Sequence, residues 1–380
     1  MKKTLFVFCL SFNLLTAPLI HANQNTVVHY NDFDINQQLN QTELDQLSTQ
    51  YLRGYFSNSQ PDTVIDDLLK ADITPLQKEY ILFNLLTEIS QQPPQAFHQK
   101  FVDRMKTYQA QASRTAEEGH IPIAVFNLNS KAHGIENIWT AYRSEQRFHQ
   151  LFNDDIQQAI SNIQLILAQE STQRRPQWLG VKNSIQALSN DALNKLSNHL
   201  LNAVKANTGI DALISHVGLL TGHFELIQKA LSSNQPQVRE LTLRHLLSDL
   251  PKSQAQALLL QNAQSGPDRK FSTSLLSQFS NESEVETFLI NQLTDKTTAA
   301  NAAFALSQSD SLTLPVILKN KYLISNNKTE KNHILLTLKL NKSSPAQLAL
   351  EDLKALIEKG SSSAKWIKSF DTRIQSSNHD

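Results

Sequence analysis

Cysteine is almost absent from the sequence: the 380 residues contain only one, Cys9. It lies within an apolar N-terminal segment that we predict to be removed, so the mature chain would carry no disulfide, no thiolate zinc site and no cysteine nucleophile. A lipoprotein signal has its cysteine at the end of such a segment, after small residues. Because Cys9 follows Phe8 inside the segment, lipidation is not expected.

Glycine and proline are also scarce, with 9 and 12 residues. Sandwiches, barrels and Rossmann-type folds contain many tight turns, and glycine usually supplies the backbone conformations that these turns need. A helical protein needs few of them. The composition therefore favours an all-α fold, which could be one elongated array of helices or two domains.

The chain lacks an excess of charge of either sign, since Lys and Arg number 35 and Asp and Glu also number 35. Removal of Lys2 and Lys3 leaves 33 basic and 35 acidic residues, a net charge of −2. This balance does not resemble the basic footprint of a nucleic-acid-binding protein. Because only 18% of the residues are charged, long-range electrostatic steering of a partner is not expected either.

Long apolar runs are missing after the N-terminus, so we expect no membrane span in the mature chain, which would need about 20 apolar residues. The N-terminus has a basic start, an uncharged apolar stretch over 5–15, the helix breaker Pro18 and a small-residue cleavage site that ends at Ala22. We therefore predict that residues 1–22 are a signal peptide and that the mature protein is periplasmic, or secreted. A retained N-terminal anchor is the alternative.

The following part of the chain is predicted to be helical, with two exceptions. Residues 23–40 are polar and irregular; Val27 to Tyr30 could form a short strand, but no hairpin signal follows, and we interpret the segment as a flexible or packed-down leader. Residues 121–129 are apolar and partly β-branched, and are predicted to be extended. They separate an N-terminal helical region, 23–120, from a second helical region, 130–222.

Local signals mark several helices in these regions. Pro61 can open a helix at its first turn, and Thr74 to Gln77 form a capping box with proline at the first helical position. Apolar residues then recur at the spacing of one helical face, as in Leu82, Leu85, Leu86 and Ile89 and again in Ile135, Ile138, Trp139 and Tyr142.

From 223 to 370 the sequence predicts short helices in pairs. The pairs are 223–231 with 237–250, 252–262 with 268–279, 283–293 with 297–306, 312–324 with 330–340, and 346–359 with 364–370. The second helices recur about every 30 residues, a period typical of solenoids. Ser283 and Glu286 have the spacing of a capping box. Residues 371–380 are predicted to be a disordered tail.

The stretch from Pro236 to Leu243 resembles the start of the second helix of a HEAT repeat, in which proline or aspartate precedes valine-arginine and an apolar stripe. The resemblance covers about 209–370 and implies an α-solenoid in which stacked helix pairs bury a common core. An irregular helical bundle is the alternative. The resemblance also implies a concave face lined by the second helices, with four basic candidates: Arg239, Arg244, Lys270 and Lys331.

Motifs with known chemistry were not found. The sequence contains no Walker loop, dinucleotide-binding glycine motif, His-Glu-x-x-His signature or Gly-x-Ser-x-Gly elbow. Two acidic pairs, Asp66-Asp67 and Asp154-Asp155, lack a third aspartate three residues further on, and we interpret them as solvated helix faces or partners of the helix dipole. We therefore predict no catalytic residue, no metal site and no cofactor, and the binding residues remain open.

The candidate histidines and tryptophans are likewise interpreted as structural residues. His133 and Glu136 share a helical face with Arg143 and Arg147, and a metal there would need further ligands such as His120 or His149, so an exposed polar face is preferred. His216 and His223 lie near a predicted helix–helix turn, where ordinary packing is preferred to a zinc site. Core positions, rather than a carbohydrate-stacking platform, are predicted for Trp139, Trp178 and Trp366.

A helical array without recognisable chemistry indicates binding. We predict an exported helical-repeat scaffold that binds a protein, peptide or envelope component through its helical surface, without catalysis. The first alternative is a periplasmic lyase or hydrolase of peptidoglycan or polysaccharide on a helical superhelix or toroid. A pocket in which acids, histidines or tyrosines converge would favour it. The second alternative is a chaperone or inhibitor of an exported enzyme.

Overall fold

The computed structural model describes residues 27–116, 121–203 and 209–360. These residues are largely helical, with 19 α-helices, one short 3-10 helix and one small three-stranded sheet. The predicted helical class is thereby confirmed. The small sheet was not part of the all-α prediction. The predicted signal peptide, His120, the last predicted helix at 364–370 with Trp366, and the predicted tail at 371–380 lie outside the described residues.

Contacts between residues divide the chain into two compact units, 1–139 and 140–380. The long helix α6, Leu128–Asp154, contributes residues to both. The boundaries predicted at 120, 129 and 222 stay predictions. None of the helices in the described part of the chain is long and apolar enough to cross a membrane. With one cysteine in the sequence, the chain cannot form an internal disulfide.

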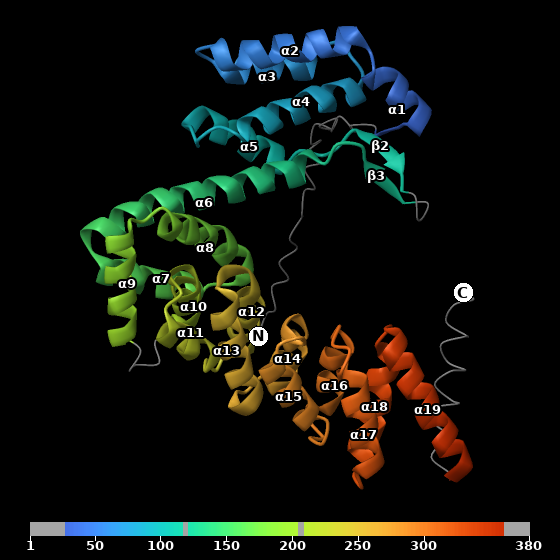
Figure 1. The fold of residues 1–380 in the computed structure, drawn as a ribbon. Coiled ribbons are helices and arrows are strands. Elements are labelled where there is room, and N and C mark those ends of the chain that lie inside the picture. Colours follow the sequence, from blue (N-terminus) through green and yellow to red (C-terminus); the bar gives the residue numbers. More distant parts are fainter. Residues whose placement is uncertain (1–26, 117–120, 204–208, 361–380) are drawn as a thin grey trace, which may run out of the picture. The chain divides into compact units, whose positions relative to one another are not determined.

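The first unit contains helices and the sheet. Its elements before α6 are β1 Val28–His29, α1 Asp32–Leu39, α2 Thr42–Ser57, α3 Pro61–Lys70, α4 Pro75–Ile89, α5 Ala96–Lys106, β2 Ala112–Thr115 and β3 Pro122–Ala124. Helix α2 packs on α3 and α4 (Figure 1). Buried aliphatic and aromatic side chains from these helices and from the start of α6 form one core, which includes Trp139.

The predicted start signals of α3 and α4 are confirmed. Pro61 occupies the first turn of α3, where its missing N–H is not needed. The Thr74 side chain accepts a hydrogen bond from the backbone N–H of Gln77, and the Gln77 side chain accepts one from the backbone N–H of Thr74, as a capping box requires. The stripe predicted to follow it, from Leu82 to Ile89, is fully buried.

The sheet includes parts of the two segments, 23–40 and 121–129, that were not predicted to be helical. Its order is β1-β2-β3, with β1 parallel and β3 antiparallel to β2. Val28 is in register with Ala112, so part of the predicted leader forms an edge strand, and α1 follows it. Strand β3 falls within the segment predicted to be extended, but Leu128 already belongs to α6.

The second unit contains the rest of α6 and all later helices. They are α7 Ile156–Leu167, α8 Ser171–Gln186, α9 Asn190–Ala203, α10 Asp211–Thr221, α11 Phe224–Leu231, α12 Pro236–Asp249, α13 Lys252–Ser265, α14 Arg269–Leu275, η1 Leu276–Phe279, α15 Ser283–Gln292, α16 Ala299–Ser307, α17 Leu314–Ile324, α18 Lys328–Leu340 and α19 Ser344–Gly360. The predicted helices between 223 and 359 thus occur, with ends shifted by a few residues, except that the helix predicted at 268–279 changes to the 3-10 helix η1 after Leu275.

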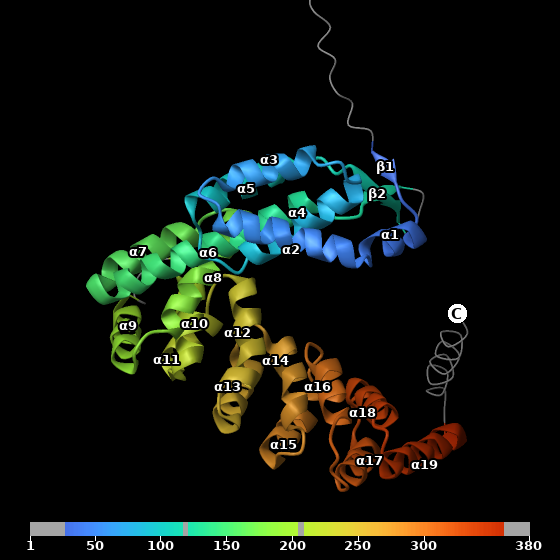
Figure 2. The same ribbon diagram turned by 90° about the horizontal axis from the view of Figure 1, so that it is seen from above.

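Alternate helices of this unit contact one another in sequence. Helix α8 contacts α10, and the contacts continue through α12, α14 and α16 to α18. We call these six helices the even-helix row. In Figures 1 and 2, helices α13, α15 and α17 form a second layer beside α12, α14 and α16. One buried cluster, from Leu219 to Ile357, runs through both layers.

The capping box predicted at Ser283 is wrong. Helix α15 takes Glu282 as its N-cap, and the backbone N–H of Glu286 bonds to the Glu282 carbonyl. Ser283 is therefore already the first helical residue. No side chain caps this end, so the spacing of Ser283 and Glu286 was a coincidence.

The start of the second unit depends on a close helix crossing. Gly180 of α8 lies against α6, and a Cβ atom placed on it would come within 2.1 Å of the Ala141 carbonyl oxygen. The Ser144 hydroxyl donates a 2.8 Å hydrogen bond to the Gln177 carbonyl at the same crossing. Only glycine permits this approach. The crossing fixes the position of α8, which carries part of the candidate site.

Candidate binding pocket

A pocket opens on the even-helix row between α8, α10 and α12. Its volume is about 330 Å³, at the lower end of the range for small-molecule sites. Each helix presents residues three or four positions apart, which places them on one helical face. The lining residues are Trp178, Lys182 and Gln186 from α8, Ala212, Ser215, His216 and Leu219 from α10, and Val238, Leu241, His245 and Asp249 from α12.

His216 is the most perturbed group of the pocket. Burial, helped by the nearby positive charge of Lys182, lowers the pKa of His216 to about 4. The imidazole is therefore neutral at neutral pH. The Trp178 ring meets it edge-on, with ring centres 6.1 Å apart and an angle of 74° between the planes. The Nε2 atom of His216 is enclosed and has no hydrogen-bond partner among the described residues.

The tautomer of His216 follows from its neighbours. The backbone carbonyl of Lys182 makes a hydrogen bond to the ring, which by itself favours the protonated form. A carbonyl only accepts, and Nε2 has no partner among the described residues, so we assign the ring proton to Nδ1. Nε2 is then a bare acceptor. An enclosed acceptor without a donor is costly and uncommon in folded proteins, and among the residues that line the pocket only His216 has one.

A second histidine lies at the more exposed side of the pocket. His245 Nδ1 is 3.4 Å from the Asp249 carboxylate, one turn further along α12. The Ser248 hydroxyl also donates to Asp249, at 2.5 Å. Lys182 forms no ion pair among the described residues. The pocket thus has one ammonium and one carboxylate on its walls, and their charges balance.

The Ser215 hydroxyl of the pocket is held by a neighbouring threonine. Thr242 donates its hydroxyl hydrogen to the Val238 carbonyl at 2.7 Å, so it accepts from Ser215, whose Oγ is 2.7 Å away. The Ser215 hydroxyl therefore donates to Thr242, and no hydrogen bond joins it to a histidine among the described residues. A general base beside this hydroxyl would be needed to activate it.

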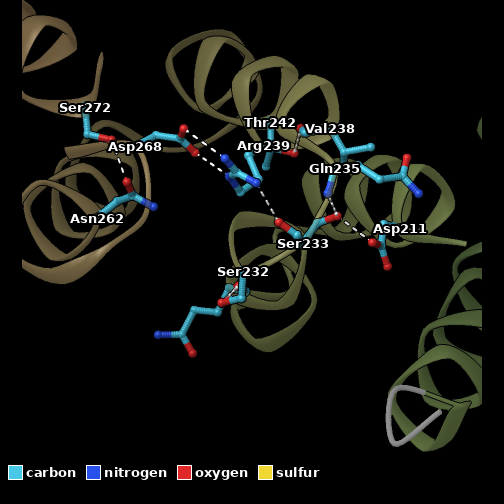
Figure 3. A network of polar contacts seen from close by, with 11 residues as sticks. Asp211, Ser232, Ser233, Gln235, Val238, Arg239, Thr242, Asn262, Asp268 and Ser272 are labelled. Atoms are coloured by element: carbon cyan, nitrogen blue, oxygen red, sulfur yellow. Dashed lines mark hydrogen bonds and ion pairs between the residues drawn. The ribbon is translucent and has the colours of Figure 1, made fainter. Parts of the chain in front are cut away.

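Arg239, one of the four basic candidates, joins two helices of the row. Its guanidinium donates from Nε and a terminal nitrogen to the two carboxylate oxygens of Asp268, at 2.6 and 3.2 Å, and from the other to the Ser233 carbonyl at 2.8 Å (Figure 3). Ser233 in turn donates its hydroxyl to Asp211. The Arg239 side chain is only 13% exposed. It holds α12 to the start of α14 and is not offered to a partner.

The other basic candidates differ in their surroundings. Arg244 pairs with Glu240 at 2.7 Å and lies over the Phe271 ring. Lys331 lies over the Tyr322 ring. Lys270 is exposed on α14. Of the four, Lys270 is the one that makes no ion pair, hydrogen bond or ring contact with another described residue.

The acidic pairs belong to solvated helix faces, as expected. Asp66 forms an exposed ion pair with Arg104 at 2.7 Å, which lowers the pKa of the Asp66 carboxyl. The Asp155 side chain caps α7 by accepting from the Gln158 N–H at 3.0 Å. Neither pair is among the residues that line the pocket between α8, α10 and α12.

The other candidate ligands are not brought together. Glu136 accepts from Gln99 at 2.7 Å and pairs with Lys106 at 3.6 Å, while His133 and His149 are exposed on α6. Arg143 is exposed on the same helix, and Arg147 lies over the Phe148 ring. His223 occupies the N-cap position of α11. Within the described ranges no three histidine, cysteine or acidic side chains are placed to hold a metal ion.

The tryptophans divide between core and pocket. Trp139 is fully buried, as predicted, and its indole N–H donates to the Gln92 carbonyl at 3.0 Å. Trp178 packs on the buried cluster around Phe148, as predicted for a core residue. It also forms a wall of the pocket, which was not predicted. His245 and Asp249 also line the pocket, and neither was predicted from the sequence as a site residue. Their four-residue spacing on a helix was visible but is common on exposed faces.

Comparison with known proteins adds no relative. No protein-family model matches the chain, and neither the curated proteins nor the solved structures contain a match.

Proposed function

We propose that this chain is an exported helical-repeat binding protein of HEAT-like architecture, which holds a protein or peptide partner on the even-helix row. The observation that carries the proposal is the pocket between α8, α10 and α12, which opens on that row. Leu241, at its edge, is 55% exposed. The pocket combines an apolar wall with a few polar side chains, a composition typical of binding sites.

A recurring ion pair supports the repeat architecture. Arg239 of α12 bonds to Asp268, 29 residues further on, and Arg269 of α14 bonds to Asp295, 26 residues further on, at 2.7 Å. Each pair ties one helix of the row to the start of the next module. A link of the same kind at nearly the same spacing is expected where neighbouring modules stack in the same way.

The predicted signal peptide at residues 1–22 supports export, so the partner is sought among periplasmic or secreted proteins and peptides. The envelope-component, chaperone and inhibitor alternatives differ from this proposal only in the partner. In each, the row carries the contact.

The test is capture from periplasmic extract, identification of the partner by mass spectrometry, and measurement of its affinity with purified proteins. Phe304 of the row is 48% exposed, and Phe224 of α11, outside the row, is 41% exposed. Phe304→Asp should weaken binding at least tenfold, whereas Phe224→Asp, the matched control, should leave it unchanged. A partner that responds equally to both variants, or no specific partner, would refute the proposal.

A polymer-cleaving enzyme is the second candidate, because two histidines and an aspartate converge on one pocket. On this hypothesis His245, oriented by Asp249, would act as the general base. The test is incubation with peptidoglycan and with periplasmic polysaccharide, followed by mass spectrometry of soluble products. Products that vanish with His245→Gln would favour the enzyme over the binding protein.

A further inference from the structure

We propose that the pocket between α8, α10 and α12 receives a neutral aromatic side chain that carries a hydrogen-bond donor, the tyrosine phenol or the tryptophan indole, from the peptide that the row binds. The inference rests on the proposed function and names the chemistry of its anchor residue. Three features of the pocket support it: an apolar wall, one enclosed acceptor without a partner among the described residues, and balanced charges.

The wall fits an aromatic ring. Trp178, Val238 and Leu241 come from two helices and present apolar surface to the same space. Aromatic pairs prefer edge-to-face or offset contacts, and the Trp178 indole already makes such a contact with His216. At about 330 Å³ the pocket suits one large side chain rather than a chain segment.

The acceptor requires a donor. His216 Nε2 has no partner among the described residues, and with the ring proton assigned to Nδ1 it presents a free lone pair. Phenylalanine and leucine could fill the apolar wall but would leave this nitrogen without a partner. Tyrosine and tryptophan place an O–H or N–H at the end of an apolar ring, which satisfies both parts of the pocket. Because Nε2 is enclosed, we expect the Trp178 ring to shift when the donor enters.

The charges select a neutral group. Lys182 and Asp249 stand on opposite helices of the pocket, one positive and one negative. A carboxylate ligand would be attracted by the first and repelled by the second, and an ammonium ligand the reverse. An uncharged polar ring meets neither penalty.

The test compares two probes that differ by one hydroxyl, N-acetyl-tyrosinamide and N-acetyl-phenylalaninamide. Their dissociation constants for the purified full chain are measured by NMR titration, and the indole signals of Trp178 are assigned by loss in Trp178→Phe. We expect the tyrosine probe to bind roughly three- to tenfold more tightly, the effect of one net hydrogen bond. We also expect both probes to shift the Trp178 indole signals.

The variant His216→Phe should remove the preference between the probes while both still bind, because it deletes the acceptor and keeps the ring. His149→Phe on the exposed face of α6 is the control and should leave the preference intact. If His216→Phe does not fold, the wild-type comparison of the two probes still decides. Equal affinities of the probes for the wild-type chain, or no binding of either in the millimolar range, would overturn the inference.

These outcomes are separate from those of the proposed function, because the amide probes need no partner protein. Equal or absent probe binding together with Phe304-dependent capture refutes the anchor and leaves the binding protein. A clear tyrosine preference without any captured partner supports the anchor pocket and refutes the proposed binding protein.

Discussion

The Arg239 guanidinium and the Asp268 carboxylate form a two-point, mostly shielded ion pair between α12 and the start of α14. The pair raises the pKa of the Arg239 guanidinium, because the charged form is the one that Asp268 binds. Hydrogen bonds between ionised partners are stronger than neutral ones, and the forked geometry fixes orientation as well as distance. The orientation of α12 against α14 therefore depends on this contact.

Replacement of Arg239 by methionine should destabilise the chain by about 1–3 kcal/mol, because it leaves the Asp268 carboxylate and the Ser233 carbonyl without their donor. Arg244→Met is the control on the same helix. Its ion pair with Glu240 is exposed, and about 0.5 kcal/mol or less is expected. The measurement is urea unfolding followed by circular dichroism, and equal effects of the two variants would contradict the assigned role.

The crossing of α6 and α8 predicts a second effect. In Gly180→Ala the new Cβ would lie 2.1 Å from the Ala141 carbonyl oxygen and 2.7 Å from the Glu145 nitrogen, so backbone must move. We expect a loss of about 3 kcal/mol or more, at the upper end of overpacking costs. Nothing lies within 4 Å of the Cβ that Gly134→Ala would add. That control should be stabilising by about 0.5–1 kcal/mol, since alanine favours helix. Thermal unfolding distinguishes the two.

Glu79 gives the first unit a pH dependence. The side chain is fully buried and accepts hydrogen bonds from the Gln111 and Ala112 N–H groups, and burial raises its pKa from 4.5 to about 7. The folded state then holds a proton that the unfolded state releases, so this group makes stability fall as pH rises from about 4.5 to 7. Below this window both states are protonated and the contribution is absent.

Glu79→Gln should abolish this fall and make the chain more stable than the wild type at pH 8, by about 1.4 kcal/mol for each unit by which the folded-state pKa exceeds the unfolded one. Glu88 lies exposed on the same helix, and Glu88→Gln should leave the slope unchanged. The free energy of unfolding is measured from pH 5 to pH 8, relative to wild type. A parallel slope for Glu79→Gln would show that Glu79 ionises freely in the fold.

Much of the helical structure could be predicted from local patterns. The stripe from Leu82 to Ile89 and the Thr74 box each lie within one turn or one helix, where spacing alone determines which side chains meet. The sheet could not be predicted in this way. Val28 pairs with Ala112, which is far away in the sequence, and short polar strands carry no signal that identifies a distant partner.

The candidate pocket was only partly visible for the same reason. His216 was considered as a zinc ligand because it lies near a predicted turn. His223, the second ligand considered there, lies at the start of the next helix. Its actual neighbours, Trp178 and His245, come from helices before and after α10. Only the packing of α8, α10 and α12 brings them together.

The central claim is that the even-helix row carries the partner, and hydrogen exchange tests it most directly. The exchange of backbone amides in the second unit is compared with and without the partner captured from periplasmic extract. The account predicts slower exchange in α8, α10, α12 and α14, strongest around the pocket. Slower exchange confined to α11, α13, α15 and α17, or to the first unit, would contradict it.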